Sequence, residues 1–424
     1  MKVLVIGGGG REHALVWKLA QSRHIDKIYC TPGNAGIAEM AECIEVGPDF
    51  DALIDFVKYN WIDITIVGPE EPLSRGIVDA FEKEGRKILG PTKAAAQLEW
   101  SKVFSKDFMR RHRIPTADYK VFTSYIHARD YVRMKGAPTV IKADGLAAGK
   151  GVVVASTVDE AEAAIDLIMK DHAFGAAGDK VIVEDCLVGE EASFMVFTDG
   201  TTIVPMASSQ DHKRVYDNDK GPNTGGMGAY SPAPVITDEL QQVVIDTVMR
   251  PTIEGLKAEG IKYKGVLYAG LMICKGKPYV LEFNCRLGDP ETQPVLFRLD
   301  SDLVDIAMAI AEERLAEVPV VWKPESAVCV VLASEGYPGS YPKGRVISGL
   351  DTAKGRENSY VFHAGTAFDD NHAFVTNGGR VLGVTALGAD IAQARDRAYA
   401  AVKEISFEGM HYRKDIAHRA LRKT

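Results

Sequence analysis

Short apolar runs alternate with amphipathic segments along the first hundred residues of the chain. Residues 2–6 and 62–67 are strand-like runs of aliphatic side chains, and residues 12–22 and 77–84 carry apolar side chains at helical spacing. Strands and helices that alternate with short connections predict a doubly wound parallel sheet. Ligands of such sheets bind at the carboxyl ends of the strands, where the glycine-rich turn at residues 7–10 falls.

The pattern changes from residue 102 onward. Short strands are predicted on both sides of a glycine-rich loop at residues 144–151. Residues 218–234 are rich in Gly, Pro and Asn, which predicts a long ordered loop. A continuous helix is predicted over about residues 292–314, and residues 322–324 (Trp-Lys-Pro) are typical of a domain boundary.

The composition narrows the class of protein. The 424 residues are 46% hydrophobic and carry a net charge of −8, which argues against nucleic acid or an anionic membrane surface as a partner. No apolar run approaches the roughly 18 residues that a membrane span needs. The six cysteines are scattered and form no C-x-x-C pair, which predicts reduced thiols and a cytoplasmic protein.

The turn at residues 7–10 is the first candidate site. Glycines let the backbone approach an anion, and the helix that follows presents free N–H groups at its positive end. The strict dinucleotide pattern requires a third glycine where this chain has Glu12. A phosphate or phosphosugar site, a plain tight turn and a nicotinamide dinucleotide site all stay open.

The run GLAAGKG at residues 145–151 differs from a Walker A loop. It is one spacer residue short, and glycine replaces the Ser or Thr after Lys150. The preceding strand ends in Lys142, so the loop joins two strands. We interpret it as a loop that folds over a triphosphate while Lys142 neutralises phosphate charge; a surface hairpin is the alternative.

Two acidic motifs lie on later strands. Glu184 ends a strand that runs into a hinge whose backbone could bond an adenine edge, and Glu191 could accept ribose hydroxyl groups, although solvated carboxylates are the alternative. Glu282 and Asn284 end another strand at positions i and i+2, which places two oxygen donors on one face. Magnesium prefers such oxygen ligands together with substrate phosphates. A hydrogen-bonding pair on an edge strand is the alternative there.

Two further runs suggest substrate contacts. Asp211 could hold an ammonium group, while Lys213 or Arg286 could hold a carboxylate. His212 suits a structural role as well as a catalytic one. The glycines at residues 225–228 suit a close backbone approach to a small ligand.

In this order the motifs resemble the ATP-grasp ligases, and more specifically the glycinamide ribonucleotide synthetase family. The resemblance rests on GGGGREHAL at the start, PGNAG at 32–36, VGPEEPL at 67–73, KADGLAAGKGV at 142–152, GPNTGGMGAYSP at 221–232 and RLGDPETQ at 286–293. It implies an α/β and α+β multidomain fold. The expected parts are an N-terminal doubly wound parallel sheet (1–101), a central ATP-grasp fold of two subdomains (102–322, with a mobile lid at about 120–190) and a small C-terminal α+β domain (323–424).

The resemblance also implies a role for each matching residue. ATP would be held by Lys102, Lys142, Gly149, Lys150, Gly151, Glu184, Asp185, Leu187 and Glu191, and Mg²⁺, with Mn²⁺ as an alternative, by Glu282 and Asn284. Asp211 and Arg286 would be catalytic, and the substrates would contact Gly8, Gly9, Gly10, Arg11, Asn34, Glu70, Asp211, Lys213, Gly225, Gly226, Arg286 and Asp289.

The implied reaction joins glycine to 5-phosphoribosylamine through glycyl phosphate, in a monomeric enzyme of purine biosynthesis. A carboxylase that uses carboxyphosphate is the nearest alternative within the superfamily. A nicotinamide dehydrogenase would leave residues 182–293 unexplained, and a nucleotide sensor without catalysis would not need the predicted metal ligands.

Overall fold

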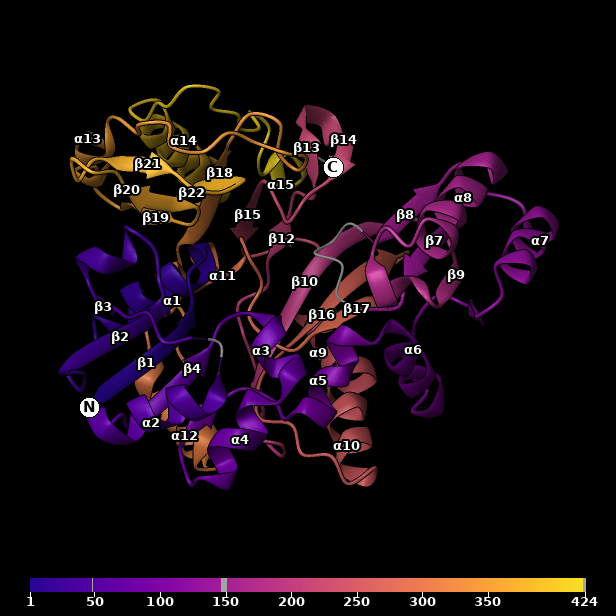
Figure 1. Ribbon diagram of the computed structural model, residues 1–424, viewed down its shortest axis with the longest axis horizontal. Coiled ribbons are helices and arrows are strands. Elements are labelled where there is room, and N and C mark those ends of the chain that lie inside the picture. The colour runs from indigo at the N-terminus through magenta and orange to yellow at the C-terminus, as the bar shows by residue number, and fades with distance from the viewer. Residues whose placement is uncertain (48, 146–150, 422–424) are drawn as a thin grey trace.

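The computed structural model describes residues 1–47, 49–145 and 151–421 (Figure 1). Its N-terminal part is a five-stranded sheet in the order β3-β2-β1-β4-β5, with every neighbouring pair parallel. The strands are β1 (Lys2–Gly7), β2 (Lys27–Pro32), β3 (Glu42–Cys43), β4 (Ile64–Val67) and β5 (Ile88–Leu89).

The central strand β1 is buried on both faces, as a doubly wound sheet requires. Val3 and Val5 pack into one core with α1, whereas Leu4 and Ile6 pack into another with α2 and α4. Later helices α11 and α12 join the first of these cores. The helices of this part are α1 (Gly10–Leu19), α2 (Phe50–Asn60), α3 (Glu70–Arg75), α4 (Ile77–Lys83) and α5 (Lys93–Trp100).

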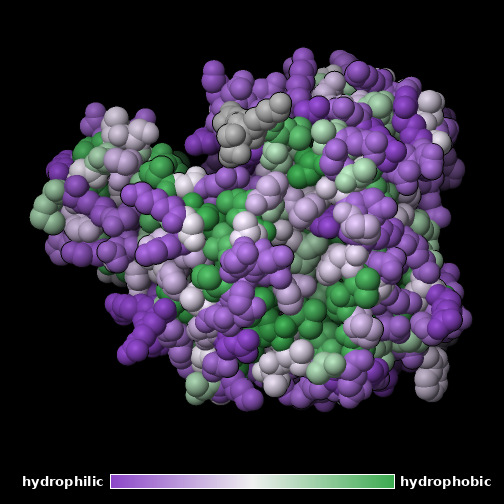
Figure 2. Space-filling view, turned by 180° about the vertical axis from the view of Figure 1, so that it is seen from behind, coloured by the Kyte–Doolittle hydropathy of each residue, from purple (hydrophilic) through white to green (hydrophobic). Residues whose placement is uncertain are grey.

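A smaller antiparallel sheet forms a lobe that stands out from the main body at the right of Figure 1 and at the left of Figure 2. We call it the protruding lobe. Its strand order is β6-β9-β7-β8, and side chains such as Val132, Ile141, Ile165 and Val183 give it a core of its own. Its elements are β6 (Tyr119–Phe122), α7 (Tyr125–Lys135), β7 (Thr139–Ala143), β8 (Val152–Ala155), α8 (Val158–Ile165) and β9 (Val181–Asp185).

The central sheet has the antiparallel order β11-β10-β16-β17. Alternate residues of β10 face opposite cores, because Phe194 belongs to the core that contains Phe108 of α6, while Met195 belongs to the core that contains Leu296 of α11. The elements are α6 (Lys102–Arg111), β10 (Glu190–Thr198), β11 (Ile203–Pro205), α9 (Asp238–Val244), α10 (Arg250–Ala258), β16 (Gly265–Cys274), β17 (Lys277–Asn284), α11 (Thr292–Arg298) and α12 (Leu303–Ala311).

The C-terminal sheet is shared between distant parts of the chain. Its order is β12-β15-β18-β22-β19, so two strands from before residue 235 share a sheet with three strands from the last hundred residues, joined where β15 pairs with β18. The elements are β12 (Gln210–Asp211), β13 (Arg214–Tyr216), β14 (Lys220–Asn223), β15 (Gly228–Ser231), β18 (Ser326–Ala333), α13 (Leu350–Lys354), β19 (Ser359–His363), β20 (Thr366–Phe368), β21 (Phe374–Thr376), β22 (Arg380–Gly388), α14 (Ile391–Val402) and α15 (His418–Leu421).

The doubly wound N-terminal sheet and the mixed multidomain architecture are confirmed, whereas two local predictions are wrong. Residues 218–234 are not a loop, because they contain β14 and β15. The helix predicted over 292–314 breaks between α11 and α12, where Leu299 forms an isolated bridge with Trp322 and its carbonyl accepts a hydrogen bond from Lys18. No helix among the described residues is long and apolar enough to cross a membrane.

Candidate active site

A cavity of about 510 Å³ lies where the N-terminal sheet, the protruding lobe, the central sheet and the C-terminal sheet meet. Its charged side chains separate into two groups. We call the first the lysine end (Lys102, Lys106, Lys142 and Glu184) and the second the carboxylate end (Arg11, Glu70, Glu99, Asp211, Lys213, Glu282, Arg286, Asp289, Glu291 and Arg380).

Two of the three lysines at the lysine end pair with one carboxylate. Glu184 Oε2 lies 3.1 Å from Lys106 Nζ and 3.0 Å from Lys142 Nζ, and all three side chains are buried. Lys102 instead donates to the carbonyl of Gly145 at 2.8 Å. Burial lowers the pKa of Lys106 to about 8, with Glu184 opposing the shift and Lys142 adding to it. This concentration of positive charge favours an anionic ligand.

Glu184 keeps one free acceptor at this end. Its Oε1 atom is buried and has no hydrogen-bond partner among the described residues. An unpaired buried acceptor is costly, so a ligand that donates an N–H group would be favoured here. The carbonyl of Glu184, in contrast, already accepts from the hydroxyl of Thr139 at 2.7 Å.

Glu282 and Asn284 both line the cavity from β17, as their i, i+2 spacing predicts. Burial raises the pKa of Glu282, whereas the charges of Lys213, Lys142 and Lys102 lower it by more, so the net shift of the pKa is downward. The carboxyl group is therefore ionised at neutral pH. An ionised carboxylate and an amide oxygen on one strand face form a donor set that fits Mg²⁺.

Asp211 and Lys213 lie beside this pair. Lys213 Nζ lies 3.4 Å from Glu191 Oε2 and 3.7 Å from Glu282 Oε1, so it links two predicted ATP and metal ligands. Burial raises the pKa of Asp211 to about 7; Lys213 opposes this shift, while Glu291 and Glu191 reinforce it. A carboxyl group held in this way gains from a cationic ligand.

Arg286 pairs with two carboxylates of the carboxylate end. It approaches Glu99 at 2.8 Å and Glu70 at 3.3 Å, and it donates to the side-chain oxygen of Asn284 at 3.1 Å. Arg11 reaches the same group, 4.0 Å from Glu70. Arg286 therefore orients the predicted metal ligand Asn284 in this structure.

The turn at residues 8–10 lies behind the cavity wall. Gly9 N donates to Glu12 at 2.6 Å, which closes the first turn of α1. A β-carbon on Gly9 would lie 3.5 Å from a carboxylate oxygen of Asp289, so the turn closely approaches that residue. Asp289 in turn pairs with Arg380 at 3.1 Å.

The structure brings most of the predicted residues to the cavity, but not all of them. Arg11, Glu70, Lys102, Lys142, Gly151, Glu184, Asp211, Lys213, Gly225, Glu282, Asn284, Arg286 and Asp289 line it. Gly149 and Lys150 lie outside the described residues. Gly8, Gly9, Gly10, Asn34, Asp185, Leu187, Glu191 and Gly226 are not among its lining residues.

Some of the residues away from the wall have other partners. Asn34 donates to the carbonyls of Gly8 and His363, each at 2.9 Å, and so joins the turn to the C-terminal sheet. Asp185 forms an ion pair with Lys135 on the outside of the protruding lobe. Glu191 reaches the site through its ion pair with Lys213.

Sequence reasoning missed several cavity residues. Lys106 follows Lys102 at i+4 on α6, so the helical period could have placed both lysines on one face. Glu291 lies inside the RLGDPETQ run, and Glu99 lies three residues before Lys102. Arg380, Tyr337 and Tyr341 come from the C-terminal part, and no local pattern points to them.

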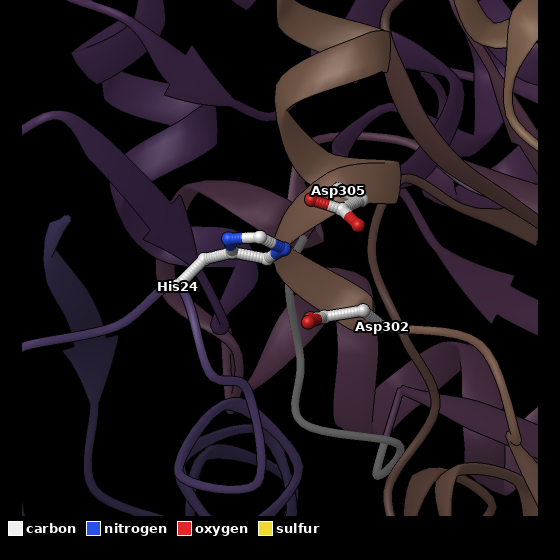
Figure 3. A group of neighbouring side chains, drawn as sticks. All are labelled: His24, Asp302 and Asp305. Carbon is white, nitrogen blue, oxygen red and sulfur yellow. The ribbon is translucent and has the colours of Figure 1, made fainter.

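A second group of possible metal ligands lies on the surface. His24, Asp302 and Asp305 hold their ligand atoms within 4.8 Å of one another (Figure 3). Asp302 accepts from Ser22 at 2.6 Å, and its other oxygen caps α12 through Val304 N. We assign Asp302 to helix capping and no metal to this group.

Comparison with known proteins identifies the family. The three domain models described as phosphoribosylglycinamide synthetase match almost the whole chain: the N domain at residues 1–99, the ATP-grasp (A) domain at 100–292 and the C domain at 327–419. The phosphoribosylamine–glycine ligase of Escherichia coli K12 is 54% identical over 428 residues, covering 99% of both chains.

Solved structures agree with this result. The crystal structure of phosphoribosylamine–glycine ligase from Thermotoga maritima superposes with a TM-score of 0.85 at 34% identity, covering 98% of this chain and 100% of the other. The biotin carboxylase domain of Hydrogenobacter thermophilus 2-oxoglutarate carboxylase has a TM-score of 0.74 at 16% identity, covering 97% and 91%, and so shares the fold alone. The chain belongs to the phosphoribosylglycinamide synthetase family.

Proposed function

We propose that this protein joins glycine to 5-phosphoribosylamine at the expense of ATP, giving glycinamide ribonucleotide, ADP and phosphate. The observation that carries the proposal is the division of one cavity into a lysine end and a carboxylate end, in a chain that matches phosphoribosylamine–glycine ligases along its whole length. Lysines suit a triphosphate, whereas carboxylates suit a divalent metal ion and an amine.

In the proposed mechanism, the glycine carboxylate attacks the γ-phosphorus of ATP, and ADP leaves. The amine of phosphoribosylamine then attacks the carbonyl carbon of glycyl phosphate, and phosphate leaves. Lys102, Lys106 and Lys142 neutralise the negative charge of the phosphates. When bound, Mg²⁺, or Mn²⁺ as an alternative, would be held by Glu282 and Asn284 and would supply further charge neutralisation.

The remaining residues bind and orient the substrates. Asp211 holds the ammonium group of glycine, and Lys213 faces its carboxylate beside the metal ligands. The free Oε1 of Glu184 accepts from the adenine amino group. The turn at residues 8–10, together with Arg11, Asn34, Glu70 and Asp289, serves the phosphoribosyl group.

Three further features belong to the same proposal. The protein acts as a monomer, and it acts in the cytoplasm; its six free cysteines support the cytoplasmic location. It takes no nucleic acid, which its net charge of −8 supports. The protruding lobe works as a lid that keeps water away from glycyl phosphate.

The test is a substrate panel assayed for ADP release. We expect release only when ATP, Mg²⁺, glycine and phosphoribosylamine are supplied together, with glycinamide ribonucleotide formed in equal amount. Equal ADP release with bicarbonate in place of glycine would instead indicate a carboxylase.

A further inference from the structure

Residues 211–219 carry Asp211 and Lys213 to the cavity on a segment with little regular structure of its own. The segment contains β12, the short strand β13 and a single 3₁₀ turn at Asp217–Asp219. Asn218 and Asp219 have φ angles of 59° and 53°, in the left-handed region that Asn and Asp adopt more readily than other non-glycine residues. These residues let the chain turn, and contacts from another segment then fix where the turn lies.

The chain between residues 411 and 419, which we call the C-terminal tail, supplies those contacts. Two arginines of the tail make two contacts each: Arg413 donates to the carbonyl of Arg214 at 3.1 Å and to Asp219 at 2.8 Å, and Arg419 donates to the carbonyl of Asp211 at 3.1 Å and to Asp219 at 3.0 Å. His411 Nε2 lies 2.9 Å from the carbonyl oxygen of Val215. Lys414 N donates to Asp217 at 2.8 Å, and Asp415 accepts from Asn218 N at 2.8 Å.

Arg413 is the buried charge of this contact, whereas the side chains of Asp219 and Asp415 are 34% and 19% exposed. The side chain of Arg413 is 0% exposed, and it pairs with Asp219 and Asp415. An ion-pair network around a buried charge seldom adds stability over a well-packed apolar contact, but it fixes geometry, because each missing partner is costly. The tail therefore fixes the position of the segment more than it stabilises the fold.

Arg419 contacts a residue that lines the cavity. Its guanidinium donates to the main-chain oxygen of Asp211 and to the side chain of Asp219, and so joins these two residues. Its guanidinium also acts with Lys213 to lower the pKa of Asp211, against burial and the charges of Glu291 and Glu191. Arg419 is not itself among the residues that line the cavity.

We propose that the C-terminal tail is a positioning device for amino-acid recognition, and that Arg419 acts through Asp211 to place the Asp211–Lys213 pair against the amino-acid substrate. This role rests on the proposed function. It makes Arg419 on α15 a determinant of affinity for glycine and not of affinity for ATP. The reason is that, in the part of the chain that the structure describes, the tail makes no contact with the lysine end.

The kinetic test compares Arg419→Gln with the unaltered protein. We expect the KM for glycine to rise about tenfold, the effect of losing one hydrogen bond from a charged donor, while the KM for ATP stays unchanged. Arg419→Lys keeps the charge and should give a smaller rise. The matched control is Arg395→Gln, since Arg395 lies half-exposed on α14 and pairs with its neighbour Asp396, away from the tail contacts. An unchanged KM for glycine, or an equal rise in both KM values, would overturn the proposal.

A second measurement does not depend on the reaction. Amide hydrogen exchange in the unliganded protein should become about tenfold faster over residues 211–219 in Arg419→Gln, with no change in β7 or β9. Unchanged exchange over this segment would overturn the proposal even in an active enzyme. If the unaltered protein released no glycine-dependent ADP, the proposed function would fail while faster exchange still supported the tail's hold on the segment.

Discussion

The two ends of the cavity differ in how their charges are balanced. At the lysine end there are three cations and a single carboxylate, Glu184, which pairs with two of them. At the carboxylate end, six carboxylates face four cations, and most of them are already joined in ion pairs. One cavity therefore has a surplus of positive charge at one end and a surplus of negative charge at the other.

This difference indicates how one pocket can bring together ligands that would otherwise repel one another. A triphosphate is attracted to the lysine end, while a metal ion and an ammonium group are attracted to the carboxylate end. Glu282 lies between them, since its pKa is lowered by lysines of both groups. The two surpluses meet where phosphoryl transfer is proposed to occur.

Removing the negative charge of Glu282, which lies between the two ends, should have the largest effect on turnover. We expect Glu282→Gln to lower kcat by at least about 10²-fold, because a neutral amide is a poor magnesium ligand. Glu71→Gln, at an exposed carboxylate on α3, is the matched control. Turnover close to that of the unaltered protein, at any Mg²⁺ concentration, would remove Glu282 from the metal site.

The lysine end can be tested separately through Lys106. Lys106→Met should raise the KM for ATP about tenfold and leave the KM for glycine unchanged, because Lys142 still pairs with Glu184. Steady-state kinetics with each substrate varied in turn would measure this, with the exposed Lys83→Met as control. A rise confined to glycine would contradict the division of the cavity.

The carboxylate end should show its own pH dependence. Since the pKa of Asp211 is raised to about 7, its carboxylate is formed as the pH rises through 7, and only then attracts the ammonium group of glycine. We expect kcat/KM for glycine to fall about tenfold between pH 8 and pH 6. Asp211→Asn should flatten this profile, and a flat profile in the unaltered protein would count against the assignment.

The smallest expected effect concerns the protruding lobe. Val154 on β8 is 45% exposed, so its face is open to solvent. If the lobe closes over ATP, amide exchange in β8 should slow severalfold when ATP and Mg²⁺ are added together. Exchange in α7, on the outer side of the lobe, serves as the internal reference. Equal rates in β8 with and without nucleotide would argue against closure.

Local patterns were enough to predict the architecture and the positions of many site residues. The period of two along β17 placed Glu282 and Asn284 on one face, and the strand before the glycine loop placed Lys142 at the cavity. The same kind of pattern was available for Lys106 through its i+4 relation to Lys102. These residues follow from the period of one element.

The missed features depend on contacts between distant segments. Residues 218–234 have loop-like composition, yet β15 becomes a strand because it pairs with β18. Arg380 reaches Asp289 only because the C-terminal sheet packs against the RLGDPETQ run. Neither the strand β15 nor the Arg380–Asp289 ion pair can be predicted from the neighbouring residues in the sequence, because tertiary pairing overrides local propensity.

The sharing of the C-terminal sheet has a consequence for how the protein is made. A ribosome releases β12 and β15 long before β18 and β22, so the nascent chain carries an uncovered strand edge until its final quarter emerges. A chain truncated in that interval would expose a strand edge that can pair with other chains, and it would lack the C-terminal part of the cavity wall. Cells that make this protein thus gain from completing each chain quickly or from shielding it during synthesis.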